Sequence, residues 1–272
     1  MAVIETDAVT VEEGVVYGRV GDRELLCDIY RPSPLAAAKH TAIVHLPGGG
    51  YRRCNRAGTR LARPLAALGY TCVSAEYRVL PEGVWPAPLH DVKSAIRWTR
   101  AHAHDLSFEP DKLVVLGHSA GGRLALMLAG TQDDAAFEGS DGLTGVSSAI
   151  AACISFYSPA SDLSRHPVVG ADPSEAQLRS VSVMNKIRPG YPPSLLFHGT
   201  EDRSVSVDEA LTLYTAMRGV GTPVELHVIE GVTHIFDAHE DLARASAEWV
   251  DRFVDRHVVN PRTYPSTEPP AL

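Results

Sequence analysis

Three residues with the chemistry of nucleophilic catalysis stand out in the sequence: a serine between glycines, a later acidic residue and a later histidine. Ser119 is the centre of Gly117-His118-Ser119-Ala120-Gly121-Gly122, which follows the apolar stretch 112–116. A Gly-x-Ser-x-Gly pattern between a strand and a helix is typical of a sharp turn that presents the serine hydroxyl above a sheet. The helix that follows favours negative charge at its amino terminus. The pattern therefore predicts a nucleophilic serine at residue 119.

A serine nucleophile needs a base, and the base needs an acid that orients it. Asp202 comes just after the apolar stretch 194–198, and His234 comes just after the stretch 223–229. Because the carboxyl ends of parallel strands meet at one edge of a sheet, the three side chains are expected to lie together. We predict that His234 takes the proton of Ser119 and that Asp202 orients the imidazole.

Other acidic residues and histidines are weaker candidates. Glu201 adjoins Asp202 and is the first alternative acid, whereas Asp208 falls in the first turn of a predicted helix, where the helix dipole stabilises it. His227 lies inside a predicted strand and His239 in a predicted helix, so neither ring is expected over the sheet edge. Four more histidines lie in polar, helical or loop contexts and are predicted to be solvated: His102, His104, His166 and His257.

A run of three glycines, Gly48-Gly49-Gly50, follows the apolar stretch 41–46. Glycines allow backbone N–H groups to turn toward a substrate with no side chain in the way. We predict that the N–H groups of Gly49, Gly50 and Ala120 bind the oxyanion of a tetrahedral intermediate. Four further residues are predicted to contact the substrate by position alone: Tyr51, Trp85, Tyr157 and Ile235.

The elements that must position these residues alternate along the chain. Strand-like stretches at 14–20 and 24–31 flank Gly21-Asp22-Arg23, which predicts an antiparallel hairpin. The remaining strands are expected at 41–46, 70–77, 112–116, 150–156, 194–198 and 223–229, and the main helices at 59–68, 89–104, 119–128, 207–218 and 239–258. This alternation predicts an α/β fold with a mostly parallel central sheet flanked by helices.

The same pattern predicts one domain over residues 1–272. The polar stretch 158–191 follows the strand near 150–156, contains a helical piece at 173–186 and is expected to form a small cap. Residues 260–272, which are rich in proline, show no packing pattern and are expected to be a flexible tail. Arg78, just past a predicted strand, is expected to tie neighbouring loops together by hydrogen bonds.

Composition narrows the class of protein further. The 272 residues are 44% hydrophobic, which excludes bulk disorder, and their net charge of −8 argues against a nucleic-acid binder. No apolar run approaches the roughly 18 residues of a membrane span, and the acidic amino terminus lacks the pattern of a signal peptide, so a cytoplasmic protein is expected. Four dispersed cysteines predict reduced thiols. We predict neither a metal site nor a cofactor.

Six segments together resemble the α/β-hydrolase superfamily: Pro47–Tyr51, Tyr77–Glu82, Trp85–Asp91, Gly117–Gly122, His198–Asp202 and Gly231–Phe236. The resemblance spans about residues 15–258. The chain is similar above all to hormone-sensitive-lipase-like carboxylesterases and to the smaller acetyl-esterase-like group often called BD-FAE. This resemblance implies an α/β-hydrolase fold and a carboxylic ester hydrolase that needs no cofactor, with the triad and oxyanion residues at the positions predicted above.

Two positions differ from the larger of these groups. Pro47 stands where the oxyanion loop often has histidine, and His118 stands where hormone-sensitive-lipase-like enzymes usually have aspartate. Both differences favour the small branch, and we expect a serine carboxylesterase that acts on small, short-acyl esters. His118 also resembles the arrangement in arylformamidases, so an amidase-type hydrolase stays open, as does a catalytically silent binding protein. The expected partner is a small ester, with neither nucleic acid nor membrane, and the sequence permits a homodimer built from the last strand and helix.

Overall fold

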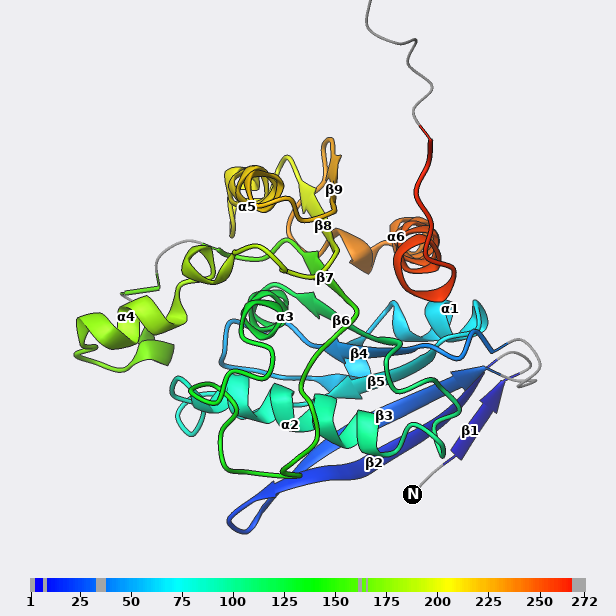
Figure 1. The fold of residues 1–272 in the computed structure, drawn as a ribbon, viewed down its shortest axis with the longest axis horizontal. Coiled ribbons are helices and arrows are strands. Elements are labelled where there is room, and N and C mark those ends of the chain that lie inside the picture. Colours follow the sequence, from blue (N-terminus) through cyan, green and yellow to red (C-terminus); the bar gives the residue numbers. More distant parts are fainter. Residues whose placement is uncertain (1–2, 7–8, 33–37, 161–162, 165, 266–272) are drawn as a thin grey trace, which may run out of the picture.

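The computed structural model describes residues 3–6, 9–32, 38–160, 163–164 and 166–265 (Figure 1). Parallel strands that are buried on both faces need apolar side chains at nearly every position, and the central strands here have them. The strands are β1 Val3–Thr6, β2 Val9–Val20, β3 Arg23–Pro32, β4 Ala42–Leu46, β5 Thr71–Ala75, β6 Leu113–His118, β7 Ala152–Phe156, β8 Ser194–Gly199 and β9 Val224–Ile229.

Within the described residues, nine strands form one sheet in the order β1-β2-β3-β5-β4-β6-β7-β8-β9. The strands from β1 to β5 along this order pair antiparallel, and those from β5 to β9 pair parallel. The sheet thus confirms the prediction of a mostly parallel α/β fold. Because β4, β6, β7, β8 and β9 run in the same direction, the loops that follow them meet at one edge.

The amino-terminal strands extend further than predicted. The hairpin of β2 and β3 is confirmed, with Val20 paired to Arg23 around the turn, but β2 starts at Val9 and β1 was not predicted. The acidic residues at the start of β2 hide its alternation of apolar and polar side chains. Glu12 forms an ion pair with Arg31 on β3, with 2.9 Å between the charged atoms, so pairing across the hairpin accommodates this charge.

Helices cover both faces of the sheet. They are α1 Ala62–Ala67, α2 Ala87–Ala101, α3 Ala120–Gly130, α4 Glu175–Val181, α5 Val207–Gly219 and α6 Glu240–Val254. One hydrophobic core contains buried side chains of α2, α3 and α5, and the other contains those of α1 and α6. Figure 1 shows these helices around the sheet. The helices are therefore divided between the two faces, as expected for right-handed crossovers in a parallel sheet.

Several predicted elements differ in length from those observed. The helix predicted at 59–68 shrinks to α1, preceded by a short 3₁₀ turn at Arg56–Gly58. The last helix ends at Val254 and continues as a wider turn over Asp255–Val259. In the predicted tail, residues 260–265 are exposed, and Arg262 pairs with Asp255 at 2.8 Å. The rest of that tail, residues 266–272, lies outside the described residues.

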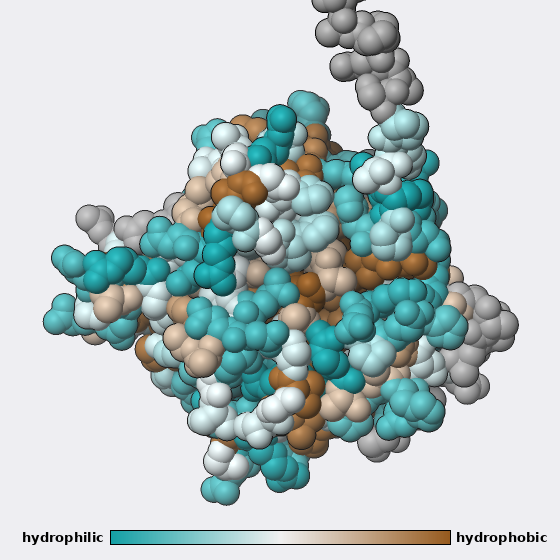
Figure 2. Space-filling model, viewed as in Figure 1, coloured by the Kyte–Doolittle hydropathy of each residue, from teal (hydrophilic) through white to brown (hydrophobic). Residues whose placement is uncertain are grey.

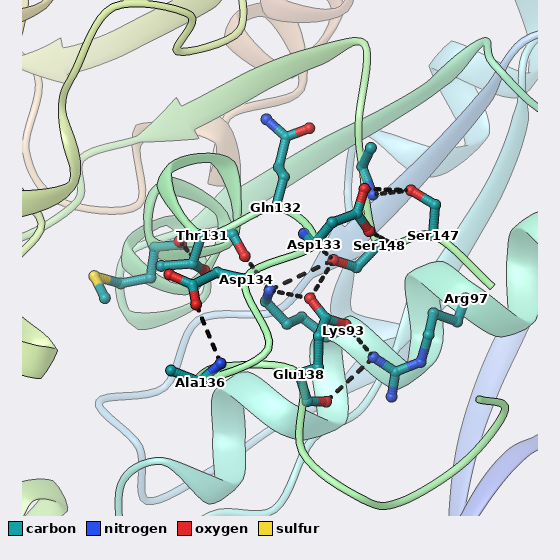
Figure 3. A network of polar contacts seen from close by, with 12 residues as sticks. Lys93, Arg97, Thr131, Gln132, Asp133, Asp134, Ala136, Glu138, Ser147 and Ser148 are labelled. Carbon is teal, nitrogen blue, oxygen red and sulfur yellow. Dashed lines mark hydrogen bonds and ion pairs between the residues drawn. The ribbon is translucent and has the colours of Figure 1, made fainter. Parts of the chain in front are cut away.

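Buried charges hold the loop between α3 and β7 against α2. The ammonium group of Lys93, which is fully buried, donates to the carbonyl of Thr131 and to the carboxylate of Glu138 (Figure 3). Arg97 binds the other oxygen of the same carboxylate at 2.6 Å, and the hydroxyl of Ser148 donates at 2.7 Å to the oxygen that Lys93 binds. These contacts fix a long irregular segment that contributes no strand or helix among the described residues.

A second ion pair acts in the way predicted for Arg78. Its guanidinium and its backbone N–H both donate to the buried carboxylate of Asp91 on α2, at 2.7 to 3.0 Å. The loop after β5 is thereby tied to the start of α2, and the prediction that Arg78 joins neighbouring segments is confirmed. This tie matters for the site because Tyr77, next to Arg78, reaches the loop after β4.

The described surface carries few large apolar side chains. Those that are exposed are Val84, Leu143, Leu211, Val228, Ile235 and Tyr264. Figure 2 shows one face of the molecule, where hydrophilic residues predominate and apolar ones form small separate areas. None of the helices among the described residues is long and apolar enough to cross a bilayer.

Candidate active site

Ser119 occupies the sharp turn between β6 and α3. Its backbone has φ of 51° and ψ of −115°, a conformation that is strained for any residue with a side chain. The turn closes because Gly121 packs on the loop after β4, where an added Cβ would come within 2.2 Å of the Leu46 carbonyl oxygen. The Ser119 N–H donates to the carbonyl of Phe156 at 2.9 Å, which fixes the turn to the neighbouring strand.

The structure brings Ser119, His234 and Asp202 together at the carboxyl edge of the sheet. His234 Nε2 lies 3.1 Å from Ser119 Oγ, and His234 Nδ1 lies 2.6 Å from Asp202 Oδ2. Because a carboxylate only accepts hydrogen bonds, the Nδ1–H of the imidazole donates to Asp202 and Nε2 is left to accept from the serine hydroxyl. This is the tautomer that a base needs in order to take the serine proton.

The carboxylate of Asp202 is buried and fully engaged. Its second oxygen accepts from the N–H groups of Ser204 and Val205 at 2.8 and 2.9 Å. Burial alone raises the pKa of Asp202, but the hydrogen bonds from His234 and from the two N–H groups outweigh burial and lower this pKa. Glu201, the alternative acid, is exposed, so the structure places Asp202 rather than Glu201 beside the imidazole.

The glycine loop after β4 lies beside the serine. In this loop Gly49 has φ of +136°, and an added Cβ would come within 2.1 Å of the Arg53 carbonyl oxygen, so only glycine fits. The buried hydroxyl of Tyr77 donates to the carbonyl of Pro47 at 2.7 Å and fixes where the loop begins. Within the described part of the chain, the N–H groups of Gly49 and Gly50 have no acceptor. The N–H of Ala120 is in the first turn of α3 and has none within its helix.

A pocket of about 900 Å³ opens in front of the serine. It is lined by all three residues of the glycine run, by Ala120 and by three of the four predicted substrate contacts: Tyr51, Tyr157 and Ile235. Trp85 does not line this pocket. Its indole N–H donates to Ser180 at 2.8 Å and its ring is buried, so Trp85 packs α4 against the loop before α2 and the structure gives no support for substrate contact.

Comparison with known proteins places this arrangement in a family. The BD-FAE family profile matches residues 27–217, most of the chain. The chain belongs to the BD-FAE family. A curated relative, the probable carboxylic ester hydrolase LipM of Mycobacterium tuberculosis, is 29% identical over 242 residues, which cover 82% of this chain and 56% of LipM. Esterase LipC of the same organism is 29% identical and covers 82% of this chain and 59% of LipC. The chain thus spans little more than half the length of these curated relatives.

Solved structures show the same fold. Esterase 2 of Thermogutta terrifontis, phosphorylated by paraoxon, is 32% identical with a TM-score of 0.78, and the match covers 93% of this chain and 96% of the esterase. A truncated carbohydrate esterase from gut microbiota superposes with a TM-score of 0.79 at 22% identity, over 92% and 98% of the two chains, which shows a shared fold. The α/β-hydrolase fold that the sequence motifs implied is therefore confirmed.

This BD-FAE protein also contains a series of buried polar side chains beside the pocket, which the sequence did not reveal. The Ser74 hydroxyl donates to a backbone carbonyl at 2.7 Å, so its oxygen accepts from His45 Nδ1–H at 2.8 Å. His45 Nε2 therefore accepts from His118 Nδ1–H at 3.0 Å. On the far side, His118 Nε2 lies 3.4 Å from Asp237, whose other carboxylate oxygen accepts from the Tyr157 hydroxyl at 2.5 Å.

One end of this series of polar side chains contacts the His234 imidazole. The Tyr157 ring lies 4.6 Å from the His234 ring, and the same tyrosine follows β7 with φ of 39°. His118, one residue before the serine, stacks on Phe156 at 4.7 Å. Tyr157 thus packs directly against the His234 ring, and His118 packs behind it against Phe156 and Tyr157. No group of described residues has the His, Cys, Asp and Glu clustering that a metal ion would need.

Two pocket features were missed or misjudged from sequence. His166 was predicted to be solvated, but it lines the pocket and its ring packs edge-on against Tyr51 at 5.5 Å. Burial and the nearby Arg52 lower the pKa of His166. Arg60 also lines the pocket, although nothing in its local sequence distinguishes it from other surface arginines. Arg53 lines the pocket as well, as its position close after the glycine run predicts. Only the tertiary packing of the loops after β4 and β7 brings these residues together.

Proposed function

We propose that this chain is a serine carboxylesterase that hydrolyses small, short-acyl esters through an acyl-enzyme. One observation carries the proposal: Ser119, His234 and Asp202 form a continuous hydrogen-bonded series, with 3.1 and 2.6 Å between the bonded atoms, at the floor of a pocket. The curated relatives named as ester hydrolases and the esterase structures with 30% identity or more support the same activity.

In the first half of the reaction, His234 Nε2 takes the proton of Ser119 as Oγ attacks the ester carbonyl. The carbonyl oxygen becomes an oxyanion, and the N–H groups of Gly49, Gly50 and Ala120 donate to it. Asp202 keeps the imidazole in the right tautomer and stabilises its positive charge. The intermediate then collapses, the bond to the alcohol breaks, and His234 returns the proton to the departing alcohol oxygen.

In the second half, water replaces the alcohol. His234 takes a proton from the water as its oxygen attacks the carbonyl of the acyl-Ser119, and the same three N–H groups bind the second oxyanion. Collapse breaks the bond to Ser119 Oγ, which regains its proton from His234. The products are one carboxylic acid and one alcohol, and the enzyme returns to its starting state.

The preference for short acyl groups rests on the segment between β7 and β8. It contributes Pro159, Leu163 and His166 to the pocket, which supports its proposed role as a small cap. Its described part holds one short helix, α4, and two 3₁₀ turns, not the long apolar helices of a lid that would bind long chains. The homodimer stays a prediction.

The test is release of p-nitrophenol from esters of increasing acyl length, with Ser119→Ala as the matched variant. Turnover that peaks between acetate and butyrate and is lost in the variant supports the proposal. Preference for long-chain emulsions contradicts the short-acyl assignment. If no ester is hydrolysed, formyl amides come next, and tight binding of a small molecule without turnover would point to a silent binding protein.

A second arm of the test identifies the nucleophile directly. Paraoxon, which phosphorylates esterase 2 of Thermogutta terrifontis, is expected to transfer its diethyl phosphoryl group to Ser119 Oγ and release p-nitrophenol. Mass spectrometry of the peptide that contains Ser119 should show one added diethyl phosphoryl group. In the Asp202→Asn variant this labelling should slow together with ester hydrolysis. Labelling at another serine would contradict the assignment of Ser119.

A further inference from the structure

Charge is distributed very unevenly along this acidic protein. Between Asp28 and Glu76 the sequence has no Asp or Glu at all, yet it contains seven Lys and Arg residues. The protein as a whole has a net charge of −8, so this segment is positively charged while the rest of the sequence is strongly negative. It runs from the end of β3 through β4, the glycine loop and α1 to β5, and therefore includes one wall of the active-site pocket.

Four of these seven cations have a partner elsewhere in the fold. Arg31 pairs with Glu12, Lys39 with Asp251, and Arg56 with both Asp28 and Glu76, while the guanidinium of Arg63 lies over the Tyr30 ring at 5.9 Å. The remaining three are exposed and have no acidic partner among the described residues: Arg52, Arg53 and Arg60. The unneutralised charge of the segment is thus concentrated in a few positions.

Two of these three arginines are at the pocket. Arg53 and Arg60 line it directly, and the Arg53 N–H donates to the Gly49 carbonyl at 3.2 Å, so Arg53 is anchored to the loop proposed to bind the oxyanion. Among the described lining residues, Asp237 is the one carboxylate, and it is buried and accepts a hydrogen bond from the Tyr157 hydroxyl. No acidic side chain of the described pocket wall is available to neutralise either guanidinium.

We propose that Arg53 and Arg60 select esters that carry a second, negatively charged group, a carboxylate, within reach of the pocket mouth. This inference rests on the proposed esterase function and adds its substrate class. A guanidinium offers a planar pair of N–H donors that matches the two oxygens of a carboxylate and stays charged at any working pH. Two such groups at the mouth of a pocket also attract an anion before it binds.

The experiment measures kcat/KM for two matched pairs of esters. The first pair places the charge on the acyl side: 1-naphthyl hemisuccinate against its neutral isostere 1-naphthyl 4-methylpentanoate. The second places it on the alcohol side: 4-acetoxybenzoate against 4-acetoxybenzamide. Each pair is assayed with the wild type, with the double variant Arg53→Gln/Arg60→Gln, and with Arg63→Gln. The last variant removes an exposed arginine of the same segment that does not line the pocket.

We expect the wild type to prefer the anionic member of at least one pair, and the double variant to lower that preference about tenfold, mainly through KM. The pair that responds tells which side of the ester carries the charge. Raising NaCl from 0.05 to 0.5 M should weaken the preference in the wild type, since salt screens exposed charges. Arg63→Gln should leave it unchanged.

Three results would overturn the inference, and they are distinguishable. If p-nitrophenyl esters are hydrolysed but neither pair shows a preference that depends on Arg53 and Arg60, the esterase assignment stands and the anionic substrate class is wrong. If the wild type hydrolyses no ester, neutral or charged, the proposed function itself fails and the substrate class fails with it. Equal effects of Arg63→Gln and of the double variant would show that general surface charge, not the pocket, causes the preference.

Discussion

Two groups of side chains in this protein each contain a buried, hydrogen-bonded charge, but only one of the two groups reaches an open pocket. In the cluster around Lys93, the ammonium group meets the Thr131 carbonyl, the Glu138 carboxylate and the Ser148 hydroxyl (Figure 3). An ammonium has three N–H donors, so all of them are used inside the protein. In the triad, the buried Asp202 is equally well bonded, but the series continues through His234 to Ser119, whose hydroxyl faces an open pocket.

The buried charge in the Lys93 cluster stabilises the fold, whereas the buried charge of Asp202 belongs to the series that we propose performs the chemistry. The cluster around Lys93 is closed, because all its hydrogen bonds are made inside the protein. When one member is removed, the remaining polar groups stay buried and lack a hydrogen-bond partner. An open series ends in a group that water or substrate can reach, so its loss costs little stability and much reactivity. Variants in the two regions should therefore have opposite effects on activity and on unfolding.

The largest effect is expected from Asp202→Asn. An amide at this position donates where a carboxylate accepts, so the imidazole loses its orientation and the tautomer with Nε2 free to accept. We expect kcat to fall about 10³- to 10⁴-fold, with a modest change in the unfolding midpoint. Steady-state kinetics together with urea unfolding test this. Glu201→Gln, at the exposed neighbour, is the control and should retain activity; equal losses in both variants would show that the acid has been misassigned.

Next in size is the loss of stability in Lys93→Met. Methionine fills a similar volume but leaves the Thr131 carbonyl and one oxygen of Glu138 without the ammonium, which should lower the free energy of unfolding by about 3 kcal/mol. The loop that it holds does not line the pocket, so kcat should stay within about twofold of the wild type. Lys112→Met removes a lysine in a surface pair with Glu109 and serves as control. A tenfold fall in kcat for Lys93→Met would mean that the two regions are coupled.

The same distinction explains what could be predicted from sequence. The triad and the glycine loop were predictable because each residue directly follows an apolar stretch, and parallel strands bring such positions to one edge of the sheet. The closed cluster was not predictable, since Lys93 looks like an exposed helix residue and Glu138 lies in an irregular loop. The pocket positions of His166 and Arg60 were not predicted for the same reason: only the packing of loops distant in sequence brings them to the pocket.

The amino-terminal strands show a different limit. β1 and the start of β2 contain several acidic residues, which weaken the alternation on which strand prediction depends. Their pairing is set by neighbours across the sheet, as between Glu12 and Arg31, and a single stretch of sequence does not contain that information. In contrast, β6 and β8 have only buried residues and their bounds were predicted to within two residues.

A pH-dependent effect of intermediate size tests His45, a residue outside the two groups that shares one feature with each. His45 lines the pocket, but both ring nitrogens are bonded inside the protein, to Ser74 and His118. Burial and the neighbouring His118 lower the pKa of His45 well below its usual value, so the folded state keeps the ring neutral. The unfolded chain takes up a proton below about pH 6.5, and folding is then opposed. Stability should therefore fall as the pH drops from 6.5 to 5.

His45→Gln should make this fall shallower by about 1.4 kcal/mol per pH unit, the contribution of one proton bound only in the unfolded state. Urea unfolding at half-unit steps of pH measures the slope. The exposed His104 provides the control, because His104→Gln should leave the slope as it is in the wild type. An unchanged slope in His45→Gln would show that the folded protein also takes up a proton at this ring.

The smallest expected effect is a difference in unfolding free energy between variants of two adjacent serines, one inside the Lys93 cluster and one at its edge. The Ser148 hydroxyl is fully buried; it donates to Glu138 at 2.7 Å and accepts from the Asp133 N–H at 3.1 Å. Ser147 is exposed, and its hydroxyl donates to the Asp133 carboxylate at 2.8 Å, where water can replace it. Ser148→Ala should therefore cost about 1 kcal/mol more unfolding free energy than Ser147→Ala. Equal costs would mean that water reaches the interior of the cluster, and the contrast with the open triad would then lie in chemistry alone, not in access.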